Sequence, residues 1–309
     1  MIKSPLFYMG NKYELIEKLH MYFPKKEEVK HFIDLFGGSG VVVINSKYEK
    51  NIYNELNKNV YDLFNLIVNT DENILLSHIN KMIKKFDLLI HETAEKTKGN
   101  DLKVRKGENQ YYNFREYYNK NKNVMDLFLL TYYSFNNYIR FNSDGNFNMP
   151  YGNGKFLPKE HTREILRFKD FIKNKKIIIK NENAFNLLEN ITKNEQHFIY
   201  LDPPYANTMA VYNEQRAGGG WSIEDDIKLF KQLDRLNELG IKWAMSNVLW
   251  TKGIHNKHIE QWAKKNNYKI ITFEEKKYNL GNNIDKYTEE VLIINYEPPF
   301  EQYDIFDFL

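Results

Sequence analysis

The chain has 309 residues, 42% of them hydrophobic, which is enough for one large domain or two smaller ones with a sizeable core. Its 44 basic and 41 acidic residues leave a net charge of +3, which permits a polyanionic partner without requiring one. It contains no cysteine, so disulfides and thiolate metal sites are excluded. Because no apolar stretch approaches about 20 residues and the first residues lack a signal core, we expect a cytoplasmic protein with no membrane contact.

The first clear pattern is a strand, a glycine-rich loop and a helix. Residues 29–34 predict a buried strand, residues 36–40 a tight loop, and a helix is expected from Val41. A second short strand, residues 52–53, ends next to Glu55. Glycines let the backbone approach a ligand, and an acid after the next strand can accept hydrogen bonds from both hydroxyls of a ribose. The sequence GGSG lacks the GxGxxG spacing of a dinucleotide site. It therefore favours a cofactor with an adenosine but no pyrophosphate, and S-adenosylmethionine is the first candidate. An ordinary tight turn is the alternative.

Helical periodicity dominates residues 61–160, where apolar residues recur at three- and four-residue spacing. Within this range the polar residues 91–109 predict a loop, and residues 114–135 predict an aromatic-rich helix. Residues 136–154 interleave one arginine and several aromatic residues with Asn and Gly. This composition suits a hairpin that presents side chains to a groove, and a plain surface loop is the alternative.

Strands and helices alternate again after residue 165. Strands are expected at residues 177–179, 196–201 and 241–248, helices at 221–240 and 259–268, and further strands at 268–276 and 287–297. Such alternation favours a mostly parallel sheet and an α/β fold, into which the helical stretch is inserted.

The sequence YLDPPY, residues 200–205, places an acid, two prolines and an aromatic ring directly after a strand. The prolines remove backbone donors and fix φ, so free carbonyls lie beside Asp202. An acceptor, a carbonyl and the face of Tyr205 suit a planar ring that carries an amino group, such as adenine with its N6. Hydrogen bonds accepted from N6 localise its lone pair and become stronger as the nitrogen gains positive charge in the transition state. A turn that merely holds two prolines is the alternative.

In this order the motifs resemble the Dam-type DNA adenine-N6 methyltransferases of bacteria and phages, over most of the chain. FYMGNKYEL is similar to their N-terminal motif, DLFGGSG to their cofactor loop, DPPY to their catalytic motif and RFNSDGNFNMPYG to their target-recognition segment. The resemblance implies a Rossmann-like, S-adenosylmethionine-dependent methyltransferase sheet formed by residues 1–60 and 161–309. It further implies an inserted, mainly helical target-recognition domain, residues 61–160.

The resemblance also implies roles for individual residues. Catalysis is assigned to Asp202, Pro203, Pro204 and Tyr205. Cofactor binding is assigned to Tyr8, Gly10, Lys12, Asp34, Phe36, Gly37, Gly38, Ser39, Gly40, Glu55, Phe185 and Asp202. DNA recognition is assigned to Arg140, Asn142, Asn148 and Pro150, with Arg140 reading a guanine and Pro150 touching a thymine methyl.

The target implied by the resemblance is duplex GATC, methylated on its adenine. The bacterial Dam enzymes have a base-reading lysine where this chain has Phe7, so the outer base pair of the site stays open. Reaching N6 requires flipping the adenine out of the duplex, at a cost of a few kcal/mol, of which stacking on Tyr205 returns about 1–3 kcal/mol. Residues 206–221, with three consecutive glycines, are expected to close over the flipped base.

Other readings remain open at this stage: a methyltransferase for RNA adenine or DNA cytosine N4, or a DNA-binding relative without catalysis. The expected partner is double-stranded DNA, with a cognate restriction endonuclease as an open second partner, and the chain is expected to be a monomer or a weak dimer. No metal site is expected, because the histidines show no spacing with acids that would hold a metal ion. The histidines considered are His31, His197, His255 and His258. Ser39 has no evident His–Asp pair and is not expected to be a nucleophile.

Overall fold

The computed structural model describes residues 1–8, 10–90, 106–193, 196–205, 220–251, 253–273, 276–277 and 287–299. The chain divides into two compact units. We call Met1–Asn11 with Asn57–Asn174 the helical unit, and Lys12–Leu56 with Lys175–Leu309 the sheet unit. The breaks therefore fall after residues 11, 56 and 174, whereas the sequence analysis placed them after residues 60 and 160. The later break reflects helix α7 (Pro158–Ile172), which packs on the other helices of the helical unit.

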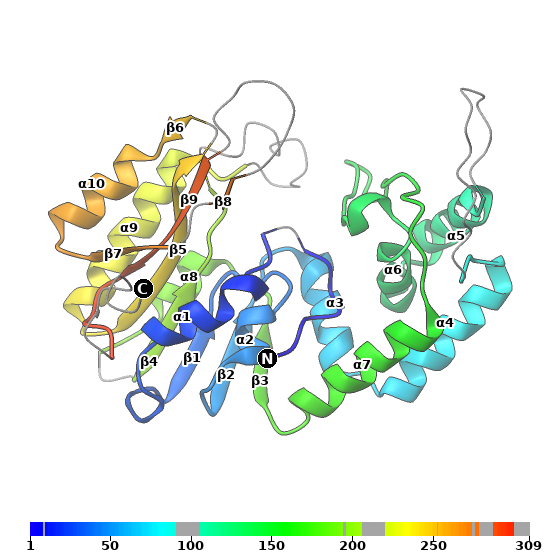
Figure 1. Ribbon diagram of the computed structural model, residues 1–309, viewed down its shortest axis with the longest axis horizontal. Coiled ribbons are helices and arrows are strands. Elements are labelled where there is room, and N and C mark those ends of the chain that lie inside the picture. Colours follow the sequence, from blue (N-terminus) through cyan, green and yellow to red (C-terminus); the bar gives the residue numbers. More distant parts are fainter. Residues whose placement is uncertain are drawn as a thin grey trace. The chain divides into compact units, whose positions relative to one another are not determined.

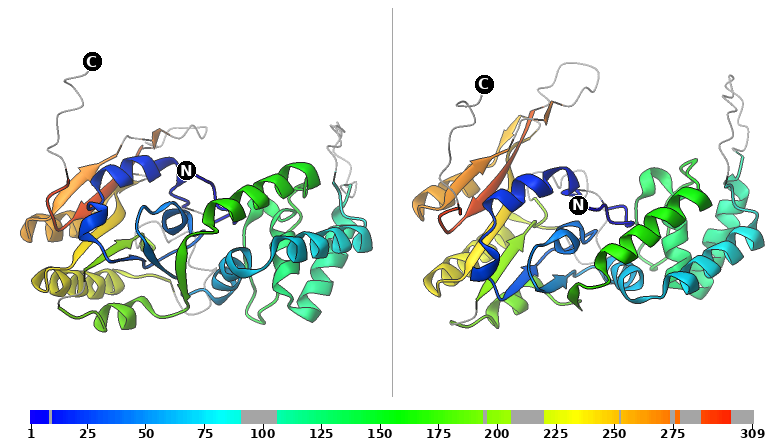
Figure 2. Two further views of the ribbon diagram at one scale, coloured as in Figure 1. Left: turned by 90° about the horizontal axis from the view of Figure 1, so that it is seen from below. Right: turned by 60° about the horizontal axis from the view of Figure 1, so that its bottom comes forward.

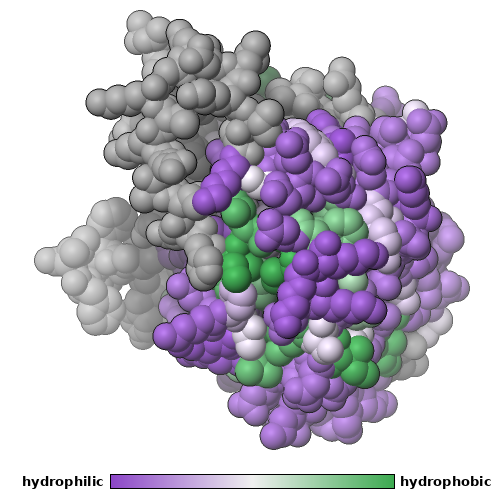
Figure 3. All heavy atoms as spheres, turned by 90° about the vertical axis from the view of Figure 1, so that its right-hand side faces the viewer, coloured by the Kyte–Doolittle hydropathy of each residue, from purple (hydrophilic) through white to green (hydrophobic). Residues whose placement is uncertain are grey.

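Among the described residues, the helical unit is built from helices, some of which begin with a side-chain cap. They are α3 (Lys58–Asn69), α4 (Glu72–Phe86), α5 (Glu108–Asn121), α6 (Val124–Thr131), the 3-10 helix η3 (Phe135–Asn137) and α7 (Figure 1). From the side on which α4, α5 and α7 lie, the surface is mostly hydrophilic, with a hydrophobic area near the centre of the view (Figure 3). Among the described residues, no helix combines the length and the apolar character needed to cross a membrane.

The single helix predicted over residues 114–135 is wrong, because the chain breaks between α5 and α6. Lys122 adopts a left-handed conformation with φ of 53° and ends α5. The side chain of Asn123 then accepts a hydrogen bond from the N–H of Met125 at 2.8 Å and starts α6. A side-chain cap of this kind satisfies a backbone donor that a helix start leaves open.

Over the part of the chain that the structure describes, the sheet unit contains a nine-stranded mixed sheet in the order β3-β2-β1-β4-β5-β9-β7, with β6 paired to β5 and β8 to β9. The strands are β1 (His31–Asp34), β2 (Lys50–Asn54), β3 (Lys176–Lys180), β4 (His197–Leu201), β5 (Lys242–Thr251), β6 (Ile254–His255), β7 (Lys269–Thr272), β8 (Lys276–Lys277) and β9 (Tyr287–Ile294). Strands β3, β2, β1, β4 and β5 pair in parallel, whereas β9 is antiparallel to both β5 and β7. The predicted α/β fold is therefore confirmed.

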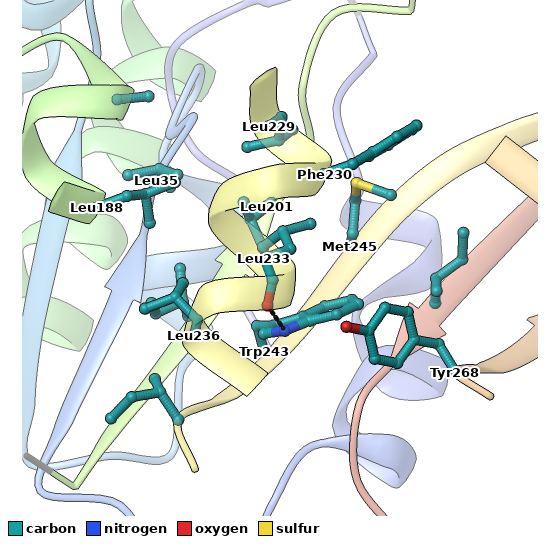
Figure 4. Close-up of a cluster of buried hydrophobic side chains, with 14 of the residues drawn as sticks. Leu35, Leu188, Leu201, Leu229, Phe230, Leu233, Leu236, Trp243, Met245 and Tyr268 are labelled. Atoms are coloured by element: carbon teal, nitrogen blue, oxygen red, sulfur yellow. Dashed lines mark hydrogen bonds between the residues drawn. The ribbon is translucent and has the colours of Figure 1, made fainter. Parts of the chain in front are cut away.

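Helices cover both faces of this sheet. Helices α8 (Ala184–Glu189), α9 (Ile223–Glu238) and α10 (Lys257–Lys265) lie on one face, and α1 (Ile16–Tyr22) lies on the other (Figure 2). On the first face Leu201 and Trp243 pack with Leu233, whose carbonyl accepts a hydrogen bond from the Trp243 indole at 3.1 Å (Figure 4). On the second face the ring of Phe198 lies 4.8 Å from that of Phe23. Because side chains alternate between faces, both faces are used for the core, and the strand ends are left to build a site.

Candidate active site

Acidic residues stand at the ends of neighbouring parallel strands. Asp34 ends β1, Glu55 follows β2 and Asp202 follows β4. Asp34 is level with Tyr53 of β2 and with Tyr200 of β4 in the strand register, so the acids emerge at one carboxyl edge of the sheet. Open α/β sheets bind their ligands at this edge.

The catalytic motif forms a compact cluster with Lys12. The Nζ of Lys12 lies 2.9 Å from Oδ2 of Asp202 and donates a hydrogen bond to the hydroxyl of Tyr205 at 3.1 Å. The Tyr205 hydroxyl in turn donates to Oδ1 of Asp202 at 2.8 Å. Pro203 is buried and Pro204 is half-buried. Because proline has no backbone N–H, the chain next to the carboxylate carries no donor at either position. The structure thus brings together residues that lie about 190 positions apart in the sequence.

The charges in this cluster are fixed by burial and by proximity. Burial alone would lower the pKa of Lys12, but the adjacent Asp202 carboxylate outweighs it, and the pKa of Lys12 is raised. Burial and the neighbouring Asp202 raise the pKa of the Tyr205 hydroxyl well above its usual value. At neutral pH Lys12 is therefore an ammonium group and Tyr205 an uncharged phenol. Asp202 keeps a cation on one side, and the ring beside it carries no charge.

The glycine loop is shaped by hydrogen bonds to β2 and to the acid that follows it. The N–H of Gly37 donates to the last carbonyl of β2 at 2.8 Å, and the N–H of Gly38 donates to Oε2 of Glu55 at 3.1 Å. Gly38 and Gly40 have φ of 50° and 73°, a left-handed conformation that glycine adopts without steric cost. Ser39 is buried between them, and Gly40 precedes the first turn of α2 (Val41–Asn45). The predicted loop residues and Glu55 are therefore neighbours.

Gly37 leaves no room for a side chain, because it packs against the buried ring of Tyr53. A Cβ atom at Gly37 would lie 2.2 Å from Cε2 of Tyr53, whose hydroxyl donates to the Gly38 carbonyl at 2.8 Å. We expect Gly37→Ala to lower the free energy of unfolding by about 1–3 kcal/mol. In a Tyr53→Leu background the same substitution should cost clearly less, as measured by urea unfolding of all four variants. An equal cost in both backgrounds would show that this contact does not shape the loop.

Asp34 is a buried carboxyl group that holds its proton to unusually high pH. It is 1% exposed, and its Oδ2 accepts a hydrogen bond from the N–H of Val43 at 3.2 Å. Burial, together with the negative charges of Asp202 and Glu55, raises the pKa of Asp34 to about 8. Asp34 is therefore mostly protonated and uncharged at neutral pH.

This raised pKa predicts a pH-dependent stability. Because the pKa of Asp34 is higher in the folded chain than its ordinary 3.8, the folded state binds a proton that the unfolded state has lost as the pH rises toward 8. Stability should then fall across this window with a slope of at most about 1.4 kcal/mol per pH unit. Asp34→Asn keeps an acceptor for Val43 and should flatten the slope in urea unfolding at a series of pH values, whereas the exposed Asp170→Asn should not. Parallel curves for wild type and Asp34→Asn would contradict the raised pKa.

Aromatic rings meet beside the glycine loop. Phe185 lies in the first turn of α8, which the side chain of Asn183 caps by accepting from the Phe185 N–H at 2.9 Å. The indole of Trp221 is nearly parallel to the Phe185 ring, at 11° and 6.1 Å between centroids, and perpendicular to the Phe36 ring, at 85° and 5.6 Å. Phe36 and Phe185, both predicted at the cofactor, are thus joined by Trp221, which the sequence analysis did not assign. Its only sequence signal is its place between the three glycines and the Ser-x-x-Asp capping box that opens α9.

The residues predicted to read DNA lie on a hairpin of the helical unit. Phe141 and Phe147 form an isolated antiparallel bridge, after which side chains alternate in the manner of a strand. Phe147 and Met149 are buried, whereas Asn148 is half-buried and Pro150 is exposed. The hairpin therefore turns one side toward its own unit and presents Asn148 and Pro150 on the other.

Arg140 is held in place by Asn148. The Nε of Arg140 donates to Oδ1 of Asn148 at 2.8 Å, and its Nη2 donates to the Asn148 carbonyl at 3.2 Å. Asn142 has a different task, because its Oδ1 accepts from the N–H groups of Asp144 and Asn146 at 3.1 and 2.8 Å. Asn142 thus folds the tip of the hairpin, and its predicted contact with DNA would have to compete with these bonds.

The N-terminal motif is split between the units. Tyr8, which is half-buried, and Gly10, with φ of 78°, belong to the helical unit, whereas Lys12 belongs to the sheet unit. Contact of Tyr8 and Gly10 with a cofactor stays a prediction. Phe7 is 40% exposed and sets its ring edge-on against Tyr132 at 5.2 Å. The predicted closing loop lies outside the described residues, apart from its last two positions.

Within the described ranges, no group of three or more His, Asp or Glu side chains is placed to hold a metal ion. Two of the histidines considered in the sequence pair with single acids. His255 lies 2.9 Å from Glu260, and His258 lies 2.8 Å from Asp226.

Residues 8–279 match the family described as D12 class N6 adenine-specific DNA methyltransferase. The chain belongs to this family, and the resemblance drawn from its motifs is confirmed.

Among curated proteins, the chain is 34% identical over 301 residues to the modification methylase StsI of Streptococcus sanguinis, covering 96% of this chain and 43% of that protein. It is 33% identical over 300 residues to the type II methyltransferase M.FokI of Planomicrobium okeanokoites, with the same coverage of 96% and 43%. It is 28% identical over 253 residues to the DNA adenine methylase of Escherichia coli (strain K12), covering 78% of this chain and 79% of that protein. The chain therefore spans less than half the length of the first two relatives.

Proposed function

We propose that the chain transfers a methyl group from S-adenosylmethionine to N6 of an adenine in duplex DNA. The observation that carries this proposal is the cluster of Lys12, Asp202 and Tyr205 at the carboxyl edge of a parallel sheet, in a chain of the D12 class family. The cluster offers an acceptor with a fixed counter-charge and an uncharged aromatic ring, which are the groups that an adenine amino group requires.

The residues at the sheet edge support binding of S-adenosylmethionine. The ligand carries a sulfonium and an ammonium group, and the acidic residues Asp34, Glu55 and Asp202 stand at this edge of the sheet. The hydrogen bond from the Gly38 N–H to Glu55 supports a role for this acid in accepting the ribose hydroxyls. Apolar ring faces for the adenine come from Phe36 and Phe185. The remaining cofactor assignments rest on the resemblance: Tyr8, Gly10, Lys12, Gly37, Gly38, Ser39 and Gly40.

In the proposed reaction the protein supplies orientation and charge. S-adenosylmethionine carries the methyl group on a sulfonium, whose carbon–sulfur bond breaks as the carbon–nitrogen bond forms, leaving S-adenosylhomocysteine. Asp202 accepts a hydrogen bond from N6, and this bond strengthens as N6 gains positive charge in the transition state. Lys12 orients the Asp202 carboxylate, while Tyr205 stacks on the adenine. N6 then loses one proton to Asp202, which passes it to water.

We further propose that the adenine is flipped out of the duplex and that the site is GATC. The amino group of a paired adenine cannot approach a carboxylate at the end of a sheet strand, and enzymes that act on bases generally extrude them. Support for GATC comes from the similarity of the hairpin to the Dam-type recognition segment, with Arg140 on the guanine and Pro150 on a thymine methyl. The outer base pair is the part that Phe7 leaves open.

The test is transfer of a labelled methyl group to a duplex with one GATC site and to a set in which each base pair of the site is changed singly. The proposal expects label in the GATC duplex, and loss of label when the inner guanine or adenine pair is changed. Loss only at the inner positions would correct the assignment of the outer pair. Transfer to RNA, to cytosine or to every duplex alike would overturn the proposed substrate.

Arg140 offers a sharper test of recognition. A bidentate contact of arginine with guanine discriminates by about 1–3 kcal/mol, so Arg140→Ala should lower kcat/KM on the cognate duplex by about 10- to 100-fold. On a duplex with a changed guanine, Arg140→Ala should transfer methyl groups as fast as wild type does. The variant would therefore no longer distinguish the two duplexes. Asn148→Ala removes the side-chain acceptor of Arg140 and keeps the backbone one, so its kcat/KM on the cognate duplex should lie between those of Arg140→Ala and wild type. The exposed Arg163→Ala of α7 serves as control, and an Arg140→Ala protein that still rejects the changed guanine would contradict the role.

A restriction endonuclease is the partner that we propose, because two relatives are named as a modification methylase and a type II methyltransferase. We propose that the chain acts as a monomer or weak dimer. Expression of the chain in a host should protect plasmid DNA from an endonuclease that cuts the unmethylated site. Unchanged cleavage of a plasmid that carries N6-methyladenine would exclude that endonuclease as the partner.

A further inference from the structure

Trp221 occupies the point where the rings of the predicted cofactor site converge. It is half-buried and packs at the border of the core that β4, β5, α8 and α9 share. It touches Phe36, which precedes the glycine loop, with its edge, and it lies nearly parallel to Phe185 of α8. These neighbours come from separate parts of the chain, so their convergence on one indole is a property of the fold.

The indole is fixed by a buried carboxylate. Its Nε1 donates to Oδ1 of Asp226 at 2.7 Å, and the other oxygen of Asp226 lies 2.8 Å from Nε2 of His258. Asp226 belongs to the first turn of α9 and is 1% exposed, and His258 comes from α10. A capping box between Ser222 and Asp225 fixes the helix start immediately after the tryptophan.

This arrangement is costly if the tryptophan only fills the core. Burying a carboxylate is unfavourable unless it is paired and hydrogen-bonded, and a phenylalanine would fill the same border without needing a partner for an indole N–H. The hydrogen bond that the indole donates to Asp226 restrains rotation of the ring, whose plane lies within 11° of the Phe185 ring. A fixed plane is what a flat, stacked ligand requires.

We propose that Trp221 is a cofactor-binding residue that contacts the adenine ring of S-adenosylmethionine beside Phe36 and Phe185. Asp226 is its positioning residue, and His258 holds Asp226 from the next helix. This inference rests on the proposed function, because it assumes that the sheet edge binds an adenosine cofactor. It adds a wall to that site that neither the motifs nor the family match assigns.

The test is binding of S-adenosylhomocysteine to the full chain by calorimetry and by tryptophan fluorescence. Trp221→Ala should weaken binding by at least about five-fold, the lower range for loss of one stacked base. Trp221→Phe should keep most of the affinity and abolish the fluorescence change that binding causes in wild type. Trp250→Phe, which removes a half-buried tryptophan of β5, is the matched control and should keep both signals.

A double-mutant cycle tests the role of Asp226. If Asp226 acts by holding the indole, Asp226→Asn should weaken binding in the wild-type background and have no further effect in the Trp221→Ala background. The inference would be overturned, and the proposed function would stand, if the two substitutions weakened binding additively. The same follows if wild type binds S-adenosylhomocysteine and Trp221→Ala binds it equally well. Failure of the wild-type chain to bind S-adenosylhomocysteine would overturn the proposed cofactor and the inference together.

Discussion

Replacing Asp202 with asparagine is expected to reduce kcat for methyl transfer by at least about 10³-fold, with duplex DNA still bound. Asparagine keeps the size of the side chain and one acceptor oxygen. It lacks the negative charge, which in the proposed reaction strengthens the hydrogen bond to N6 as that nitrogen becomes positive. The loss should therefore fall on kcat more than on the affinity for DNA, as measured by single-turnover transfer and by DNA binding.

The control for this variant is Asp170→Asn, which changes an acid whose side chain is 82% exposed on α7. It should transfer methyl groups at the wild-type rate. Thermal unfolding of both variants separates a catalytic loss from a folding defect. If Asp202→Asn remains folded and keeps kcat within about ten-fold of wild type, Asp202 does not act on the reacting nitrogen.

Replacing Lys12 with methionine is expected to lower the free energy of unfolding by about 2–3 kcal/mol, since it leaves a largely buried carboxylate without its cation. The expected value is below that for a fully buried pair, because the Asp202 side chain is 20% exposed. Transfer should fall as well, because Asp202 loses the group that orients it. In the Lys12→Met/Asp202→Asn double variant part of the stability should return, since no unpaired charge remains.

Lys242→Met is the matched control for this prediction. Lys242 pairs with Glu28 on the surface, where the two side chains are 37% and 43% exposed, and its loss should cost no more than about 1 kcal/mol. Urea unfolding of the four proteins decides the question. Equal stabilities for Lys12→Met and Lys242→Met would mean that the Lys12–Asp202 pair contributes no more than a surface pair.

The sequence predicted the parts of the fold that depend on local pattern. Strands β1, β4 and β5 read as apolar runs because both of their faces are covered by helices. Their carboxyl ends carry Asp34 and Asp202, so the edge at which a ligand would bind followed from the order of strands and acids. The glycine loop was found for a similar reason, since left-handed backbone at Gly38 and Gly40 selects glycine locally.

The parts that the sequence did not predict depend on contacts between distant segments. The break at Lys122 was hidden because the apolar and aromatic pattern continues across it. The sequence placed Trp221 only at the end of the expected closing loop, and its contact with Phe36 and Phe185 depends on the fold. Asn142 lies in a segment whose composition suits DNA contact, yet its side chain closes the hairpin turn. In each case tertiary packing or a side-chain bond decides the role.

The most direct test of the central claim is the identity of the nucleoside that the chain modifies. Duplex DNA is incubated with S-adenosylmethionine and the wild-type or Asp202→Asn protein, digested to nucleosides and analysed by mass spectrometry. We predict N6-methyldeoxyadenosine as the product with wild type and none with the variant. Methylated cytosine, or equal N6-methyldeoxyadenosine from both proteins, would contradict the proposed reaction at Asp202.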